Sequence, residues 1–556
     1  MRIAVEGCGH GTLHSIYASI AQTCKIKGWH DGVQLLIIGG DFQAVRNAHD
    51  LPTMSVPPKY RAIGDFHEYY SGRRHAPYLT LFVGGNHEAS SHLMELYHGG
   101  WVAPNIYYLG AASVVNYGGL RIAGLSGIWN AGDYNKPRRE RLPYDNREVR
   151  SVYHVREWDV RRLCNLRTQV DVGVSHDWPR GVEWDGDWKG LFRRKDLFEK
   201  DAREGKLGSV AARKVMDRLR PKWWFSAHLH CKFSAVVKYD GKEGKGRGTE
   251  RNGAKAGEGA DLVSQVGNPN EIPIDGDEVG NGTHLVVPAK NEDEIDLDMD
   301  EEDETAGPLE TNKPQGPAQP KDPSFESVPE ALRAQLPASF AKHNTPPPPE
   351  SLPPPPNIKN KTTHFLALDK CLPHRQFLQV LDVDPISKHA TTPKQKSPRL
   401  SYDKEWLAIT RVFAGEADPT SQLPRDKGEA YYASRIAAEE EWVEQNLVQK
   451  DRMVIPENFE RTAPVYDPAV GLYPREQSKE YTNPQTVAFC EMLQIPNHFD
   501  APEEDREERR RNAPPEDQGH GGGGGRGAGG NRGRGHGGRG GGGGRYSNRG
   551  RGRGYR

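Results

Sequence analysis

Five short polar motifs, each placed after an apolar run, constrain this chain more than any other feature of its sequence. In chain order they are Cys8-Gly9-His10, Gly40-Asp41, Gly85-Asn86-His87-Glu88, His176-Asp177 and His228-Leu229-His230. Short apolar runs rich in β-branched and aromatic residues are typical of buried strands. Open α/β sheets place their functional sites at the carboxyl ends of the strands. We therefore expect the five motifs to gather at one site, although a single Asp or His in such a place is more often a turn or surface residue.

The apolar runs and the segments between them predict a layered α/β fold. Strands are expected at residues 2–6, 33–38, 79–83, 120–123, 170–174 and 223–227. Residues 13–27 carry apolar side chains at helical spacing after Thr12, and Gly28 follows as a stop signal. Strands that alternate with helices in this way indicate a layered α/β domain. Met1 almost abuts the first strand, so we expect no signal peptide.

The residue types in the motifs suit hydrolysis of a phosphoester by two metal ions. Cys, His, Asp and Asn side chains are all suitable metal ligands. Two cations about 3.5–4 Å apart can lower the pKa of a water, neutralise charge on the phosphoryl oxygens and assist the leaving group. The ordered set of motifs therefore predicts a two-metal phosphoesterase.

These motifs resemble those of the calcineurin-like metallophosphoesterase superfamily, which read D-x-H, G-D, G-N-H-E, H and G-H-x-H. The chain is more closely similar to the family of RNA lariat debranching enzymes, whose first motif is C-x-H. Ala227 stands where many superfamily members have Gly, which is a mild departure. The resemblance covers about residues 1–239 and 362–495 and includes four longer strings. These are Tyr69-Tyr70-Ser71-Gly72, GGNHEAS from Gly84, GGWVAPNIYYLG from Gly99, and FLALDKCLPHR from Phe365 to Arg375.

The resemblance implies a fold and a role for each motif residue. The fold would be a layered α/β/β/α metallophosphoesterase sandwich with a helical C-terminal domain. Two divalent ions would be bound by sets that share Asp41 as a bridge, namely Cys8, His10, Asp41 and His230 for one, and Asn86, His176 and His228 for the other. Asn86 and His87 would be catalytic, with His87 donating a proton to the departing 2′ oxygen. The Cys8 thiolate favours the softer Fe²⁺ or Zn²⁺ over Mg²⁺, and Mn²⁺ is a further candidate.

A basic and aromatic segment, residues 129–159, is the candidate for substrate recognition. Cations bind phosphates and aromatic rings stack on unpaired bases, which is how looped or single-stranded RNA is held. The segment lies where the resemblance implies a lariat recognition loop, and the alternative is an ordinary solvated surface. The candidate RNA-binding residues, two of them outside this segment, are Arg138, Arg139, Arg141, Tyr144, Arg156, Tyr70 and Ser71.

The rest of the chain divides by composition. Residues 240–361 contain an acidic run and proline repeats, which predicts a disordered insertion after a catalytic domain at 1–239. In a C-terminal debranching domain at 362–500, strands at 365–368 and 377–383 could complete the sheet, and helices are expected at 402–413 and 429–448.

The tail, residues 501–556, is expected to be disordered. From Gly519 it holds nine Arg and no Asp or Glu, in a Gly-rich context that resembles RGG segments. Such a tail predicts auxiliary contacts to RNA or to proteins. The net charge of −1 therefore conceals separate acidic and basic blocks.

The sequence thus predicts an enzyme of mRNA processing and intron turnover that hydrolyses the 2′-5′ phosphodiester of branched (lariat) intron RNA in the nucleus. Six scattered cysteines argue against a disulfide framework, and no run approaches the roughly 20 apolar residues of a membrane span. One alternative is a generic metallophosphoesterase, although the GDxVDRG of protein phosphatases is absent after Gly40. The other is a non-catalytic RNA-binding protein on this fold, although no expected ligand has been lost.

Overall fold

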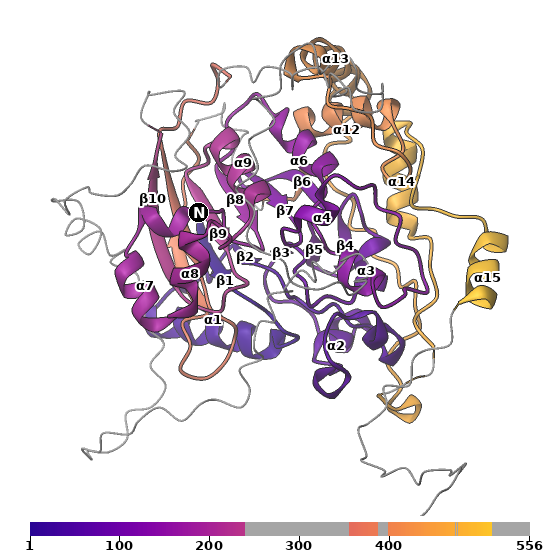
Figure 1. The fold of residues 1–556 in the computed structure, drawn as a ribbon, viewed down its shortest axis with the longest axis horizontal. Helices are drawn as coiled ribbons and strands as arrows, with labels where there is room; N and C mark the ends of the chain where they lie inside the picture. Colours follow the sequence, from indigo (N-terminus) through magenta and orange to yellow (C-terminus); the bar gives the residue numbers. More distant parts are fainter. Residues whose placement is uncertain (240–354, 387–397, 473, 475, 514–556) are drawn as a thin grey trace, which may run out of the picture. The chain divides into compact units, whose positions relative to one another are not determined.

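Two β-sheets lie at the centre of the fold (Figure 1). The computed structural model describes residues 1–239, 355–386, 398–472, 474 and 476–513. In order across the first sheet, the strands are β12 (Leu378–Asp382), β1 (Arg2–Glu6), β2 (Leu35–Ile38), β3 (Thr80–Phe82), β5 (Ile106–Tyr108) and β4 (Gly100–Ala103). The second sheet contains β10 (Phe233–Lys238), β11 (Thr362–Ala367), β9 (Trp223–Ser226), β8 (Val172–Ser175), β7 (Leu120–Leu125), β6 (Ala112–Tyr117) and β13 (Ser401–Tyr402).

The strands that precede the motifs run parallel within each sheet. In the first sheet, β1 pairs with β2 and β2 with β3 in parallel. In the second, β7, β8, β9 and β11 form one parallel run. The motif residues therefore leave their strands at the carboxyl ends, as the sequence pattern predicts.

Three apolar clusters show the layering. Side chains such as Ile37 and Val174 pack between the two sheets. On the outer face of the first sheet, Ala4 packs with Ile16 of the helix α1 (Leu13–Lys27). On the outer face of the second sheet, Trp224 belongs to a cluster with residues of several helices. The order of layers is helix, sheet, sheet, helix, which confirms the predicted α/β/β/α arrangement.

Helices cover both outer faces and supply the C-terminal region (Figure 1). Helix α1 ends at Gly28, whose φ of 64° is left-handed and suits glycine. The other α-helices in residues 1–239 are α2 (Phe66–Tyr70), α3 (Ser90–Met94), α4 (Ala131–Tyr134), α5 (Glu148–Ser151), α6 (Glu157–Cys164), α7 (Trp188–Arg194), α8 (Leu197–Arg203) and α9 (Val210–Leu219). The C-terminal helices are α12 (Lys404–Glu416), α13 (Glu429–Val443), α14 (Pro484–Leu493) and α15 (Glu503–Asn512).

The six strands and the helix predicted for the first 239 residues are confirmed, with ends that shift by one or two residues. The two C-terminal strands are confirmed as β11 and β12, and the C-terminal helices as α12 and α13. Helix α12 begins later than predicted because Asp403 caps it by accepting from the backbone N–H of Trp406 at 3.0 Å. Helix α13 ends at Val443 and continues as a π-helical turn, Glu444–Val448.

The predicted catalytic and C-terminal segments pack together as one body. Residues 362–500 do not form a separate body, because β11 lies inside the second sheet, β12 extends the first, and Met1–Ala513 is one compact unit. The predicted insertion is ordered from residue 355, since Ile358 is buried there. The predicted tail contains α15. The remainder of both segments lies outside the described residues. No helix in the described ranges is long and apolar enough to cross a membrane.

Candidate metal centre

Left-handed backbone turns aim four of the predicted ligands. His10, Asp41, His228 and His230 have φ values of 41°, 46°, 63° and 46°. Non-glycine residues rarely adopt this conformation, and it concentrates at functional sites because it costs of order 1–3 kcal/mol per residue. Each of these residues lies within four residues of the end of a strand, so the sheets hold the strained turns in place.

Glycines allow the loops to approach one another closely. A Cβ on Gly40 would lie 2.2 Å from Nδ1 of His176, and one on Gly85 would lie 2.1 Å from Oδ1 of Asp41. No side chain fits at either position. The Gly of the G-D motif and the second Gly of the G-G-N-H-E string are therefore requirements of packing at this site.

The first predicted ligand set converges. One ligand atom from each of Cys8, His10, Asp41 and His230 lies within 4.8 Å of all the others. His10 Nε2 is 3.3 Å from His230 Nε2 and 3.7 Å from Asp41 Oδ2. Cys8 and Asp41 are buried, whereas the two histidines are half-buried. These four residues thus form a candidate metal site that opens to solvent on the histidine side.

The second predicted set lies against Asp41 as well. His176 Nε2 is 3.4 Å from Asp41 Oδ1 and 3.2 Å from Asn86 Oδ1. The His228 ring lies 5.0 Å from that of His176. Asp41 therefore contacts both sets, in the place expected of a bridging ligand. That these residues bind metal stays a prediction.

The protonation of His176 fits a cation in this second set. Its Nδ1 donates to the Gly39 carbonyl at 2.9 Å, and burial lowers the pKa of the ring, so the ring is neutral and Nε2 carries a lone pair. That lone pair faces the carboxylate oxygen of Asp41 and the amide oxygen of Asn86. Three acceptors converge with no proton between them, which is an arrangement that a cation completes.

The electrostatics of the first set fit a cation too. Burial lowers the pKa of His10 to about 4 and that of His230 to about 2, so both rings keep free lone pairs at neutral pH. Burial alone would raise the pKa of Asp41, but the neighbouring histidines hold it well below its usual range. Burial and the nearby Asp41 carboxylate raise the pKa of the Cys8 thiol, and a bound cation would reverse that effect.

The motif residue His87 lies outside both ligand sets. It donates its backbone N–H to Asp41 Oδ1 at 2.9 Å, and its half-buried ring lies edge-on to His10 at 5.8 Å. Its side chain is therefore beside the centre and open to solvent, as expected of a group that meets the substrate.

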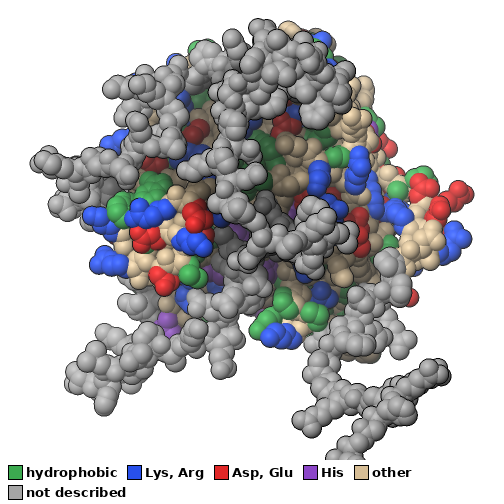
Figure 2. Space-filling view, viewed as in Figure 1, with side chains coloured by type: hydrophobic (Ala, Val, Ile, Leu, Met, Phe, Trp, Pro, Cys, Tyr) green, Lys and Arg blue, Asp and Glu red, His purple; other side chains and the backbone are tan. Residues whose placement is uncertain are grey.

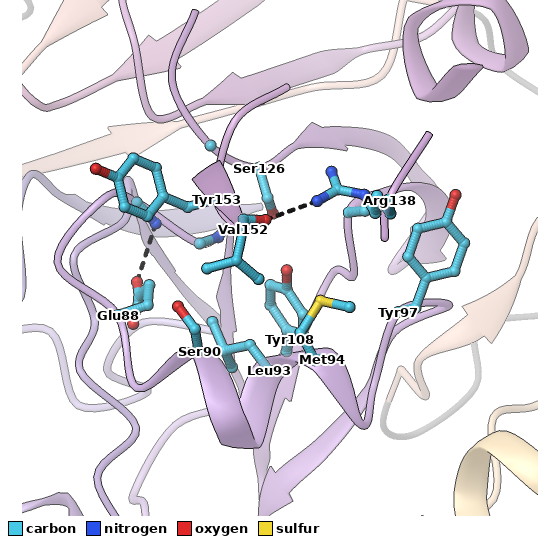
Figure 3. A pocket seen from close by; sticks show the side chains of 14 residues that line it. Glu88, Ser90, Leu93, Met94, Tyr97, Tyr108, Ser126, Arg138, Val152 and Tyr153 are labelled. Carbon is cyan, nitrogen blue, oxygen red and sulfur yellow. Dashed lines mark hydrogen bonds between the residues drawn. The ribbon is translucent and has the colours of Figure 1, made fainter. Parts of the chain in front are cut away.

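Sequence reasoning missed the role of Glu88. The buried carboxylate accepts the backbone N–H of Phe42 at 2.8 Å and of Gly85 at 3.0 Å on one oxygen, and that of Gln43 at 2.8 Å on the other. Burial raises its pKa to about 7. Glu88 also lines a cavity (Figure 3). The other lining residues include Gly84 and Gly85, residues 126–127 and residues 152–153. It ties the Asp41 loop to the Asn86 loop, and its place in the G-N-H-E motif was the signal that could have indicated this.

Four of the predicted RNA-binding residues are structural instead, which corrects their assignment. Arg138 is buried, donates to the Val152 carbonyl at 2.8 Å and pairs with Asp159 at 3.3 Å (Figure 3). The other three are Arg156, Tyr144 and Tyr70. Arg156 pairs with Glu140, and Tyr144 packs in a small apolar cluster. Tyr70 donates to the Ala463 carbonyl at 2.8 Å. A group enclosed by protein partners cannot also hold RNA in this conformation.

The remaining three candidates are more accessible. Arg139 is exposed, and Ser71 is half-buried. Arg141 is half-buried, donates to the His498 carbonyl at 2.9 Å and lies over the Phe499 ring. Of the seven predicted residues, Arg139 therefore presents the most available cation.

Two facing sheets with thiol, carboxylate and imidazole donors gathered beyond their strand ends define a calcineurin-like metallophosphoesterase. A family model of the lariat debranching enzyme C-terminal domain matches residues 360–498. The chain is 39% identical over 494 residues to the lariat debranching enzyme of Schizosaccharomyces pombe, an alignment that covers 88% of this chain and 95% of that protein. The chain belongs to the lariat debranching enzyme family.

Relatives from animals agree. The lariat debranching enzyme of Drosophila melanogaster is 39% identical over 503 residues, covering 89% of this chain and 78% of that protein. The human lariat debranching enzyme is 36% identical over 501 residues, covering 89% and 69% respectively. In each case the similarity extends through most of the chain and is not confined to the motifs.

Proposed function

We propose that this chain is a metal-dependent phosphodiesterase that hydrolyses the 2′-5′ bond at the branch point of excised intron lariats and releases linear RNA. The observation that carries the proposal is the convergence of Cys8, His10, Asp41 and His230 within 4.8 Å. This cluster lies in a chain whose curated relatives are named lariat debranching enzymes. A decayed, non-catalytic relative would not be expected to keep the complete donor set.

In this proposal the site residues have separate roles in binding metal and in proton transfer. Cys8, His10, Asp41 and His230 would hold one divalent ion, and Asn86, His176 and His228, which lie beside Asp41, would hold a second. When bound, the ions supply a water of lowered pKa and neutralise charge on the phosphoryl oxygens. The His87 ring, half-buried beside His10, donates a proton to the departing 2′ oxygen.

The donor chemistry favours particular ions. A thiolate beside two imidazoles and one carboxylate prefers soft or borderline cations, so Fe²⁺ or Zn²⁺ fits the first position better than Mg²⁺, and Mn²⁺ is the next candidate. The second position, with its amide and carboxylate oxygens, is harder in character. The two positions are therefore expected to differ in metal preference.

Substrate recognition is assigned to the exposed part of residues 129–159, above all Arg139, and half-buried Arg141 and Ser71 are the further candidates. The Arg/Gly-rich tail would add contacts to RNA or protein that depend on salt. Because introns are excised in the nucleus, we place the protein there, and a fluorescent fusion excluded from nuclei would refute that location.

One assay tests the central proposal. Purified protein is incubated with a branched RNA and with its linear 3′-5′ counterpart, after metals are removed and again after Mn²⁺, Zn²⁺ or Fe²⁺ is restored. Cleavage of the branch alone, and only with metal, is the expected result. Equal cleavage of both RNAs would favour a generic phosphoesterase, and binding without cleavage would favour an RNA-binding protein.

A further inference from the structure

A turn from the C-terminal part of the chain lies directly beside the first ligand loop. The backbone N–H of Cys8 donates to the Asp369 carbonyl at 3.3 Å, and that of Cys371 donates to the Cys8 carbonyl at 3.4 Å. Cys8 and Lys370 are paired across this bridge. The position of Lys370 relative to the metal centre is therefore fixed by the backbone.

The Lys370 side chain is half-buried, and its charge reaches the centre. It lowers the pKa of both His10 and His230. The bridge to Cys8 places the base of the Lys370 side chain beside the first ligand set. A protonated lysine has no lone pair to give a metal, so its role there is toward an anion.

Further cations lie near the last ligand motif. Arg194, at the end of α7, donates to the Lys232 carbonyl at 3.4 Å, just beyond the last ligand motif. Burial and the Asp369 carboxylate raise the pKa of the Cys231 thiol, next to His230, whereas Lys195, Arg194 and Arg375 lower it, and Arg375 pairs with Asp369 at 3.5 Å. Figure 2 shows Lys and Arg side chains interspersed with Asp and Glu on the side of this face that carries α7 and α8. The Lys370 turn therefore lies among three further cations and one carboxylate, that of Asp369.

We propose that Lys370 binds the phosphate of the branch nucleotide that is not cut. This inference rests on the proposed function. A branch ribose carries phosphates on its neighbouring 2′ and 3′ oxygens, so the 3′ phosphate lies within one ribose of the metals when the 2′ phosphate is in place for cleavage. A cation fixed beside Cys8 and outside the ligand sets meets that second phosphate. Backbone phosphate contacts of this kind fix the register of a nucleic acid.

The test compares two substrates that differ only at the 3′ position. One is a branched RNA with both 2′-5′ and 3′-5′ links, and the other has the same 2′-5′ link and a free 3′ hydroxyl. We expect Lys370→Gln to lower the ratio of kcat/KM for the first substrate over the second by about tenfold, as for loss of one charge-assisted contact. Lys370→Arg should restore most of the ratio.

A matched control and the metal content complete the experiment. Lys222→Gln removes a half-buried lysine at the opposite end of β9 from His228, and it should leave the ratio unchanged. An active, metal-loaded Lys370→Gln protein with an unchanged ratio overturns the inference, including the case in which both rates fall equally because Lys370 contacts the scissile phosphate. Wild-type protein that cuts neither substrate would instead refute the proposed function.

Discussion

Replacing Glu88 by glutamine should loosen the metal centre without touching a ligand. The carboxylate accepts three backbone N–H groups, two on one oxygen and one on the other. A glutamine has a single oxygen, and its NH₂ group would face at least one of these buried donors. Each buried donor left without an acceptor costs about 1–3 kcal/mol. We therefore expect Glu88→Gln to lower the free energy of unfolding by about that amount.

The same change should weaken metal binding, because Glu88 joins the Asp41 loop to the Asn86 loop. Loss of a residue that orients ligands typically costs about 10–100-fold in metal affinity. The measurements are denaturant unfolding and calorimetric titration with Mn²⁺ at pH 8, above the pKa of about 7 for this carboxyl. At that pH the wild-type side chain is ionised and accepts all three bonds.

Glu199→Gln is the matched control. Glu199 lies on α8 and pairs with Arg203 on the exposed surface, so its loss should cost less than about 1 kcal/mol. If Glu88→Gln matches the wild type in both stability and metal affinity, the three backbone bonds do not hold the two loops together.

Four further predictions concern the site and its surroundings. His87→Ala should keep its metals and RNA affinity yet lose turnover by about 10²–10⁴-fold in single-turnover assays, since a proton donor is removed; loss of metal would make His87 a ligand. Cys8→Asp should shift the activating ion from Zn²⁺ or Fe²⁺ toward Mn²⁺, and an unchanged preference across a metal titration would count against a thiolate ligand. Burial raises the pKa of Glu183 from 4.5 to about 7, so the folded state binds the carboxyl proton more tightly than the unfolded state does. This tighter proton binding stabilises the folded state fully below pH 4.5, and the stabilisation is lost as the pH rises through 7. Glu183→Gln should therefore exceed wild-type stability at pH 8 by on the order of 1–3 kcal/mol and lose that advantage toward pH 4, as thermal unfolding at several pH values would show. Arg138→Gln should destabilise by about 1–3 kcal/mol, because the Val152 carbonyl and Asp159 Oδ2 lose a buried donor while Arg162 and Tyr97 still contact Oδ1, whereas exposed Arg139→Gln should affect RNA cleavage without changing the melting temperature.

Strands buried on both faces could be read directly from the sequence. β2 is a continuous apolar run and β8 a short, fully buried segment with two Val, so their positions and the motifs after them were predictable. β10 alternates between buried and exposed residues and was missed, as were β4 and β5, whose register shifts at Trp101. Such strands depend on their neighbours more than on their own composition.

The candidate site was also predictable only in part from the sequence. Ligand residues follow strands in a fixed order, so sequence alone could group them. Composition could not distinguish the buried Arg138 and Arg156 from the exposed Arg139, because the partners that enclose the first two, Asp159 and Glu140, are fixed only by the folded loop. Glu88 was missed because two of the N–H groups that it accepts come from a loop some 45 residues earlier in the chain.

The placement of β11 inside the second sheet bears on how the protein is made. A ribosome completes all five motifs by His230, but β9 then lacks β11, one of its two parallel neighbours, and the N–H of Cys8 lacks the Asp369 carbonyl, until more than a hundred further residues have emerged. Until then the nascent chain exposes an unpaired strand edge, which is a site for misassociation. Domains synthesised at about 5–20 residues per second leave that edge open for several seconds or longer. A message broken after the last motif would therefore yield an aggregation-prone fragment, because β11 and the Asp369 turn that supports Cys8 would be missing.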